Sequence, residues 1–237
     1  MFKNVVPISH ERHRTTKVRS LENYSFARGV HVASLMLHEF PMASSALPIV
    51  FLEQQGSEDF FAAALLGFKA GENLYLDKDG QWTASYVPAI LRRYPFTLAR
   101  TKEEGQFSLC IDEASDLLNA ESGQPLFQDT GEPGEIIEKA KRYLIELQQM
   151  EQMTTVFCRT LKEKNMLTPF SMQIREGEAQ QTVTGCYTIN EERLGALSDQ
   201  AFLDLRKSRY LPAIYSHLTS LLQIERLGRA RANSPLK

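Results

Sequence analysis

The stretch GEIIEKAKRYLIELQQMEQMTTVFCRTLKEKNM, residues 134–166, decides the fold of this 237-residue chain. Apolar and small residues recur along it every three or four positions, which is the spacing of one face of an α-helix. Pro133 comes just before this helical pattern and Pro169 just after it, where helices begin and end. The pattern predicts one helix of about 50 Å, since each helical residue adds ~1.5 Å. Its apolar face consists of Ile136, Ala140, Tyr143, Leu144, Leu147, Met150, Thr154, Phe157 and Leu161.

A helix of this length needs a partner surface, and the sequence leaves two open. Ala140, Leu147, Thr154 and Leu161 repeat every seven residues, which is typical of a coiled-coil-like seam. The seam can pack on the chain's own sheet or last helix, or against a second copy of the chain. Because the helix exceeds the width of most sheets, we expect a two-fold homodimer through this helix or through the apolar face of the last one.

The first 127 residues have the pattern of strands, with short apolar runs separated by turn residues. The turn Asp77–Gly80 should close one hairpin, and residues 96–99 and 107–111 should form a second across residues 103–105. Residues 87–94 fit one short helix or turn that stops at Pro95. The predicted strands are residues 5–8, 30–37, 48–52, 60–68 and 73–76.

After the long helix, residues 170–174 and 182–189 predict one more hairpin, turning at residues 176–179. Asn190 and Ser198 are N-cap residues that should open two short helices. The sequence then predicts a last helix over residues 210–227 and a frayed tail over residues 228–237.

The order of these elements predicts the α+β class. Residues 1–127 should be mainly strands in a mixed, mostly antiparallel sheet, and residues 134–227 mainly helical with one hairpin. The long helix and the C-terminal helices should pack on the sheet. With no repeat and no linker in the sequence, we expect a single domain over residues 1–237.

Charge and hydropathy exclude several partners. The 27 Lys and Arg nearly balance the 29 Asp and Glu, so the chain has no basic field for nucleic acid. Its longest apolar runs, such as residues 60–68, are far shorter than the ~20 residues of a membrane-spanning helix. Polar residues from His10 onward interrupt any secretory signal, which favours a cytoplasmic protein.

Residues with chemical potential are few, and each has a structural alternative. Cys110, Cys158 and Cys186 lie among apolar residues, which predicts small buried side chains in a reducing compartment. His10 and His13 have ligand-like spacing but stand in a polar stretch, so a solvated loop is expected and no metal site.

Acid–base chemistry and cofactor binding have weak support in the sequence. The cluster of Asp112, Glu113 and Asp116 could act as acid or base if one carboxylate were buried, whereas loop solvation or helix capping is the favoured interpretation. No phosphate-binding glycine motif is present, so we expect no cofactor, and the catalytic residues, if any, are unknown.

The most unusual composition is Arg92-Arg93-Tyr94-Pro95-Phe96, which puts two guanidinium groups beside an aromatic pair. Such a pair of arginines can hold a carboxylate through two parallel hydrogen bonds. Tyr75, Trp82, Tyr86 and Tyr94 could line an aromatic pocket next to Arg92 and Arg93. In the alternative, these aromatic rings fill the core and the arginines stack on them.

Several stretches together resemble the bacterial SapC family. They are NLYLDKDGQW (73–82), YVPAILRRYPF (86–96), LCID (109–112), GQPLF (123–127) and YSHLTSLLQ (215–223). The resemblance implies a noncatalytic accessory or surface-layer-related bacterial protein, and therefore a surface association as the alternative to the cytoplasm. The peptide-transport permease that shares the family's name is excluded by the lack of an apolar span.

The resemblance also implies partners. Other members resemble companions of flavin-dependent tryptophan-halogenase-like proteins and of TonB-dependent receptors. A second hypothesis follows, in which the chain is a small-molecule or peptide binder, or an enzyme, that acts with a halogenase-like partner. The resemblance supplies no catalytic residue that could be placed on this sequence.

Overall fold

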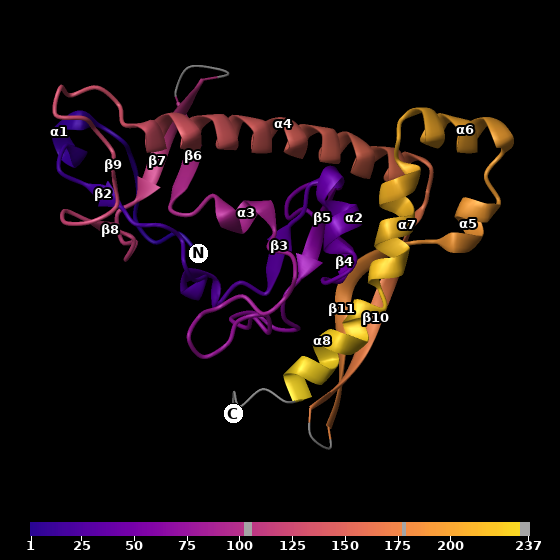
Figure 1. Cartoon of the computed structure of the whole chain (residues 1–237). Coiled ribbons are helices and arrows are strands. Elements are labelled where there is room, and N and C mark those ends of the chain that lie inside the picture. The colour runs from indigo at the N-terminus through magenta and orange to yellow at the C-terminus, as the bar shows by residue number, and fades with distance from the viewer. Residues whose placement is uncertain (102–105, 177–178, 233–237) are drawn as a thin grey trace.

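Helix α4 (Glu135–Glu163) is the longest element of the structure and confirms the helix predicted over residues 134–166. The computed structural model describes residues 1–101, 106–176 and 179–232. In Figure 1, α4 runs across the top of the molecule. Strands β6 (Phe96–Arg100) and β7 (Phe107–Asp112) lie near its N-terminal end, and β5 (Phe60–Leu65) and α2 (Phe40–Ala43) lie further along. Its 29 residues give a length of about 43 Å at ~1.5 Å per residue.

A five-stranded antiparallel sheet lies under the second half of α4, in the order β10-β11-β4-β5-β3. Phe51 of β4 lies in the middle of this sheet, because it pairs with Ala62 of β5 on one side and with Tyr187 of β11 on the other. The hairpin predicted after the long helix is confirmed by the β10–β11 pairing, and residues 177–178 of its turn lie outside the described residues. The strands are β3 (Val32–Ser34), β4 (Ile49–Glu53), β5 (Phe60–Leu65), β10 (Leu167–Glu176) and β11 (Ala179–Ile189).

Two smaller antiparallel sheets lie toward the other end of α4. The order β1-β7-β6 joins β1 (Val5–Pro7) to the predicted hairpin of β6 (Phe96–Arg100) and β7 (Phe107–Asp112), which is confirmed, although residues 103–105 lie outside the described part. The order β8-β2-β9 joins strands of two residues, too short for a period-two pattern, so the sequence could not predict them. These are β2 (Lys17–Val18), β8 (Leu118–Asn119) and β9 (Gln124–Pro125).

Helix α4 contributes to three separate groups of packed side chains. Ile137 belongs to a group with Val18 and Phe96, and Leu147 to a group with Met36 and Ala89. Phe157 belongs to the largest group, which includes residues of the five-stranded sheet. One helix therefore connects the small sheets to the large one. The α+β class is confirmed, and the single-domain organisation stays a prediction.

The heptad seam of α4 packs inside the chain. Phe157 is fully buried, and its ring lies 6.0 Å from that of Phe40, 6.2 Å from Phe51 and 5.0 Å from Tyr210. Leu147 and Leu161 are buried as well. Of the two partner surfaces left open by the sequence, this face uses the chain itself, because Phe157 packs with Phe51 of the sheet and Tyr210, and Leu147 with Met36 and Ala89. Self-association stays a prediction, and it would have to use other residues.

The last predicted helix is two helices, α7 (Leu211–Ser220) and α8 (Gln223–Ala232). The prediction of one helix over residues 210–227 was wrong, because the chain turns at Leu221 and Leu222 with hydrogen bonds spanning three residues instead of four. The frayed tail was wrong as well for residues 228–232. Arg231 is buried and pairs with buried Glu72 at 3.2 Å, which holds the end of α8 in place. Residues 233–237 lie outside the described part.

The strand predicted over residues 73–76 is absent from this described segment. The Asn73 side chain accepts the Tyr75 amide at 3.0 Å and donates to the Ala27 carbonyl at 3.0 Å, so the chain bends where the strand should start. The turn Asp77–Gly80 forms as predicted, but it closes a single bridge between Leu76 and Trp82 instead of a hairpin. The strand predicted over residues 30–37 is likewise short, because residues 37–39 form the 3₁₀-helix η2 (Leu37–Glu39).

The remaining helices are short. Both predicted N-caps are confirmed: Asn190 accepts the Arg193 amide at 2.9 Å and Ser198 accepts the Ala201 amide at 3.3 Å. The short helix predicted within residues 87–94 is α3. The elements are α1 (His10–His13), η1 (Ser25–Ala27), α2 (Phe40–Ala43), α3 (Ala89–Arg92), α5 (Glu191–Gly195) and α6 (Asp199–Lys207).

Replacing Phe157 with Ala should lower the free energy of unfolding by about 3–5 kcal/mol, because the cavity would open where three aromatic rings meet. Val156, its neighbour on α4, is 53% exposed, so Val156→Ala should change stability by about 0.5 kcal/mol or less. Urea denaturation of both variants measures the difference. Equal, small effects would show that Phe157 is not in the core.

Candidate ligand-binding site

Two of the predicted pocket residues, Tyr75 and Trp82, form a stacked aromatic pair, and Tyr86 adjoins this pair through its backbone carbonyl. The rings of Tyr75 and Trp82 stack with centroids 5.6 Å apart and planes 19° apart. Tyr75 donates its hydroxyl to the Ala46 carbonyl at 3.2 Å, and the Trp82 indole donates to the Tyr86 carbonyl at 2.8 Å. Their polar atoms are therefore used within the chain, as expected for rings that fill a core.

Buried Glu39 fixes the segment that leads into α3. One carboxylate oxygen accepts the Tyr86 hydroxyl at 2.6 Å and the Ala89 amide at 2.8 Å, and the other accepts the Met36 amide at 2.8 Å. Tyr143 of α4 donates its hydroxyl to the Ala89 carbonyl at 2.9 Å. Both backbone groups of Ala89, the first residue of α3, are thereby held by side chains from other elements. Sequence analysis missed Glu39, because nothing in its local pattern distinguishes it from an exposed glutamate.

Arg92 and Arg93 follow at the end of this fixed helix. The Arg92 guanidinium lies 5.9 Å from the centre of the Tyr86 ring, and that of Arg93 lies 5.2 Å from the Phe2 ring. Burial lowers the pKa of Arg93, whose Nε atom has no hydrogen-bond partner. An arginine remains charged at neutral pH, so this side chain keeps a positive charge in a partly dry environment.

These two arginines and Tyr94 line a hollow of about 260 Å³ beside the first half of α4, here called the arginine hollow. Tyr94 is itself fixed, because its ring stacks on Phe26 at 4.0 Å with the planes 9° apart. Arg19 and Lys139 also line the hollow. Its apolar wall consists of Val18, Leu21, Pro95, Phe96, Leu117, Ile136, Ala140 and Leu144. The structure thus brings Arg92, Arg93 and Tyr94 together at one hollow. Tyr75, Trp82 and Tyr86 are not in its lining, although the Tyr86 ring lies close to Arg92.

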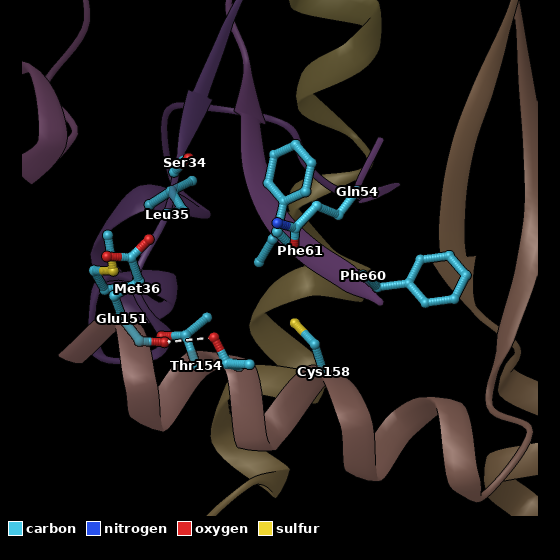
Figure 2. Close-up of a pocket in the computed structure, with 11 residues that line it drawn as sticks. Ser34, Leu35, Met36, Gln54, Phe60, Phe61, Glu151, Thr154 and Cys158 are labelled. Atoms are coloured by element: carbon cyan, nitrogen blue, oxygen red, sulfur yellow. Dashed lines mark hydrogen bonds between the residues drawn. The ribbon is translucent and has the colours of Figure 1, made fainter. Parts of the chain in front are cut away.

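A second hollow, of about 270 Å³, lies between β3, β5 and the middle of α4 (Figure 2). Cys158 lines it, and burial raises the pKa of this thiol to about 12. The thiol is therefore protonated at neutral pH and a poor nucleophile. Thr154 and Thr155, on its α4 side, donate their hydroxyls to the carbonyls of Met150 and Glu151. The two threonine hydroxyls of this hollow are thus used within the helix.

All three cysteines are free and buried, which confirms their predicted role as small core residues. The solvated loop predicted for His10 and His13 is wrong for His13, which is 2% exposed at the end of α1 and lies 3.3 Å from a Glu113 oxygen. Over the described ranges, no three His, Cys, Asp or Glu side chains are grouped so that they could hold a metal ion.

The prediction that the acidic cluster of Asp112, Glu113 and Asp116 is a solvated loop or a helix cap is wrong for Asp112. Asp112 is fully buried, and its carboxylate accepts the backbone amides of Lys3 at 3.0 Å and Asn4 at 2.7 Å. It thereby holds the N-terminal segment against β7. Glu113 pairs with Arg12 at 2.5 Å, which holds its pKa below the usual value.

His217 of α7 is fully buried beneath the large sheet. Its Nε2 atom accepts the Ile189 amide at 3.1 Å, and its ring lies 4.9 Å from that of Phe51. Burial lowers the pKa of His217 to about 3, so the imidazole is neutral at physiological pH. Its role is therefore to connect α7 to β11.

The class of protein defined by these features is an α+β protein with a cationic, apolar-walled hollow beside one long helix. The family model SapC matches residues 8–227, so the chain belongs to the SapC family. No curated protein and no solved structure matches the chain. In the described part, none of the helices is both long and apolar enough to cross a lipid bilayer.

Replacing Glu39 with Ala should lower the free energy of unfolding by about 3 kcal/mol or more, because two buried amides and a partly buried hydroxyl would lose their acceptor. The matched control is Glu53→Ala, which removes one exposed acceptor of the Tyr187 hydroxyl and should cost less than about 1 kcal/mol. Hydrogen exchange provides the local measurement, since the Ala89 amide should lose protection. Unchanged exchange at Ala89 would contradict the role assigned to Glu39.

Stability should fall in acid because of His217. The folded chain keeps this side chain neutral, while the unfolded chain protonates it near its ordinary pKa of 6.5. Its contribution is therefore complete above pH 6.5 and decreases as the pH falls toward about 3, by up to ~1.4 kcal/mol per pH unit. His217→Gln should flatten this dependence in urea titrations at several pH values. Exposed His38 is the control, and His38→Gln should leave the slope unchanged.

Proposed function

We propose that this protein is a noncatalytic accessory protein that acts by binding a ligand in the arginine hollow. The observation that carries the proposal is the Arg93 guanidinium, a partly buried positive charge whose Nε atom has no partner, beside an apolar wall. A positive charge held partly out of water is costly to a protein, and an anion bound beside the guanidinium would offset that cost.

The state of the reactive groups supports binding over catalysis. The Cys158 thiol is protonated at neutral pH, since its pKa is raised to about 12, and the His217 imidazole is neutral and hydrogen-bonded within the core. Burial likewise raises the pKa of Tyr94 and Tyr143, which line the arginine hollow. These phenols are therefore poor bases at neutral pH.

The family resemblance supplies the setting of this proposal. A surface-layer-related role, a homodimer, and a halogenase-like or TonB-receptor-linked partner all fit a protein that binds without reacting. With a halogenase-like partner, the partner would supply the flavin chemistry and this chain the binding site. Either a cytoplasmic or a surface-associated location is compatible with a binding role for this chain and a catalytic role for the partner.

The test is an NMR screen of the isotope-labelled full chain against mixtures of small neutral, anionic and zwitterionic compounds, followed by mass spectrometry of each hit after prolonged incubation. Hits should shift the amides of Arg93, Ala140 and Tyr143 and be recovered unchanged. Arg93→Gln should abolish those shifts, whereas Arg206→Gln, on the exposed side of α6, should preserve them. No shift with any compound, or chemical conversion of a hit, would overturn the proposal.

A further inference from the structure

We propose that the arginine hollow selects a small apolar carboxylic acid without an ammonium group, so that a monoanion binds in preference to the matching amino acid. The inference rests on the proposed function and adds the chemical class of the ligand. Its basis is the charge, the wall and the fixed geometry of the hollow.

The charges that line the hollow are all of one sign. Arg19, Arg92, Arg93 and Lys139 are cations, and no Asp or Glu is among the described residues of the lining. A zwitterion would bring its ammonium group next to these cations without a carboxylate to receive it, and it would lose hydration on entry. A monoanion carries no ammonium group, and every charged side chain of the lining is a cation.

Arg92 and Arg93 are the cations available to a ligand. Lys139 pairs with Glu135 at 2.8 Å, and Arg19 donates to the Asp116 carbonyl oxygen. In contrast, neither Arg92 nor Arg93 has a carboxylate within 4.0 Å in the described part of the chain. Two neighbouring guanidinium groups can give a carboxylate several charge-assisted hydrogen bonds.

The wall and the volume limit the rest of the ligand. Phe96, Ile136, Ala140 and Leu144 present apolar surface, which favours a hydrocarbon group over a sugar or a phosphate ester. At about 260 Å³ the hollow is slightly smaller than the ~300–1,000 Å³ typical of sites for drug-sized molecules. One ring or one short branched chain therefore fits beside the carboxylate.

The arginines are held in position before a ligand arrives. Glu39 and Tyr143 fix both backbone groups of Ala89, and α3 carries Arg92 only three residues later. A site that is already ordered loses little conformational freedom on binding. Arg93 also borders an adjacent hollow of about 220 Å³, which contains Glu151 and Arg100 and is therefore of mixed charge. The uniformly cationic hollow is the better site for an anion.

The experiment is calorimetric titration of the full chain with two matched pairs of compounds. These are 3-phenylpropanoate with L-phenylalanine, and 4-methylpentanoate with L-leucine, and each pair differs only by the ammonium group. At least one carboxylate should bind at least tenfold more tightly than its amino acid. The uncharged amide of that acid tests the role of the charge, and inorganic phosphate tests the role of the apolar wall. Each should bind at least tenfold more weakly than the carboxylate.

Three variants connect the binding to the hollow. Arg93→Gln should weaken carboxylate binding at least tenfold, and Arg206→Gln should leave it unchanged. Ala140→Leu fills the hollow without altering its charge and should weaken carboxylate binding too. It serves as the second test if Arg93→Gln does not fold. Circular dichroism of each variant is the control for folding.

The outcomes separate this inference from the proposed function. If the amino acids bind as tightly as their acids, or phosphate binds more tightly than either, the selectivity is wrong and the binding function stands. If only compounds without a carboxylate are found in the NMR screen, the inference is again overturned. If nothing binds in either experiment, both are wrong.

Discussion

The burial of one long helix face is the constraint on which the rest of this structure depends. Helix α4 has apolar side chains over its whole length, and no single sheet of the described chain is long enough to cover them. Its first turns pack against the small sheets, its middle against Met36 and Ala89, and its last turns against the five-stranded sheet. The need to cover this face therefore brings distant parts of the chain together (Figure 1).

The arginine hollow results from this arrangement. The first half of α4 supplies Tyr143 and part of the apolar wall, and α3 and the turn after it supply Arg92, Arg93 and Tyr94. Glu39 belongs to η2, at the middle of α4, yet it fixes the helix that carries the arginines. A buried carboxylate needs several hydrogen-bond donors, and the donors of Glu39 are available only at this position. The geometry of the hollow thus depends on residues that do not line it.

Much of the fold could be predicted, because periodicity and capping are local signals. The long helix, both hairpins that flank it and the N-caps Asn190 and Ser198 were all predicted from neighbouring residues. The errors occurred where distant contacts prevail over local pattern. Asn73 breaks a predicted strand by bonding to Ala27, and Arg231 turns a predicted tail into helix by pairing with Glu72. Neither partner can be identified from sequence spacing.

The sequence by itself determined the α+β class, the family and the Arg92-Arg93-Tyr94 motif, because each is written in consecutive residues. Only the tertiary structure decided which aromatic residues accompany the arginines. Tyr75, Trp82 and Tyr86 were expected around them, but Tyr75 and Trp82 stack on each other, and only the Tyr86 ring lies near an arginine, Arg92. Part of the wall of the hollow comes instead from α4, more than 40 residues later in the chain, and part from residues 18–21 and 117. A pocket is lined by side chains that are distant in the sequence and close in space. Which side chains come close depends on how α4 packs across the sheets.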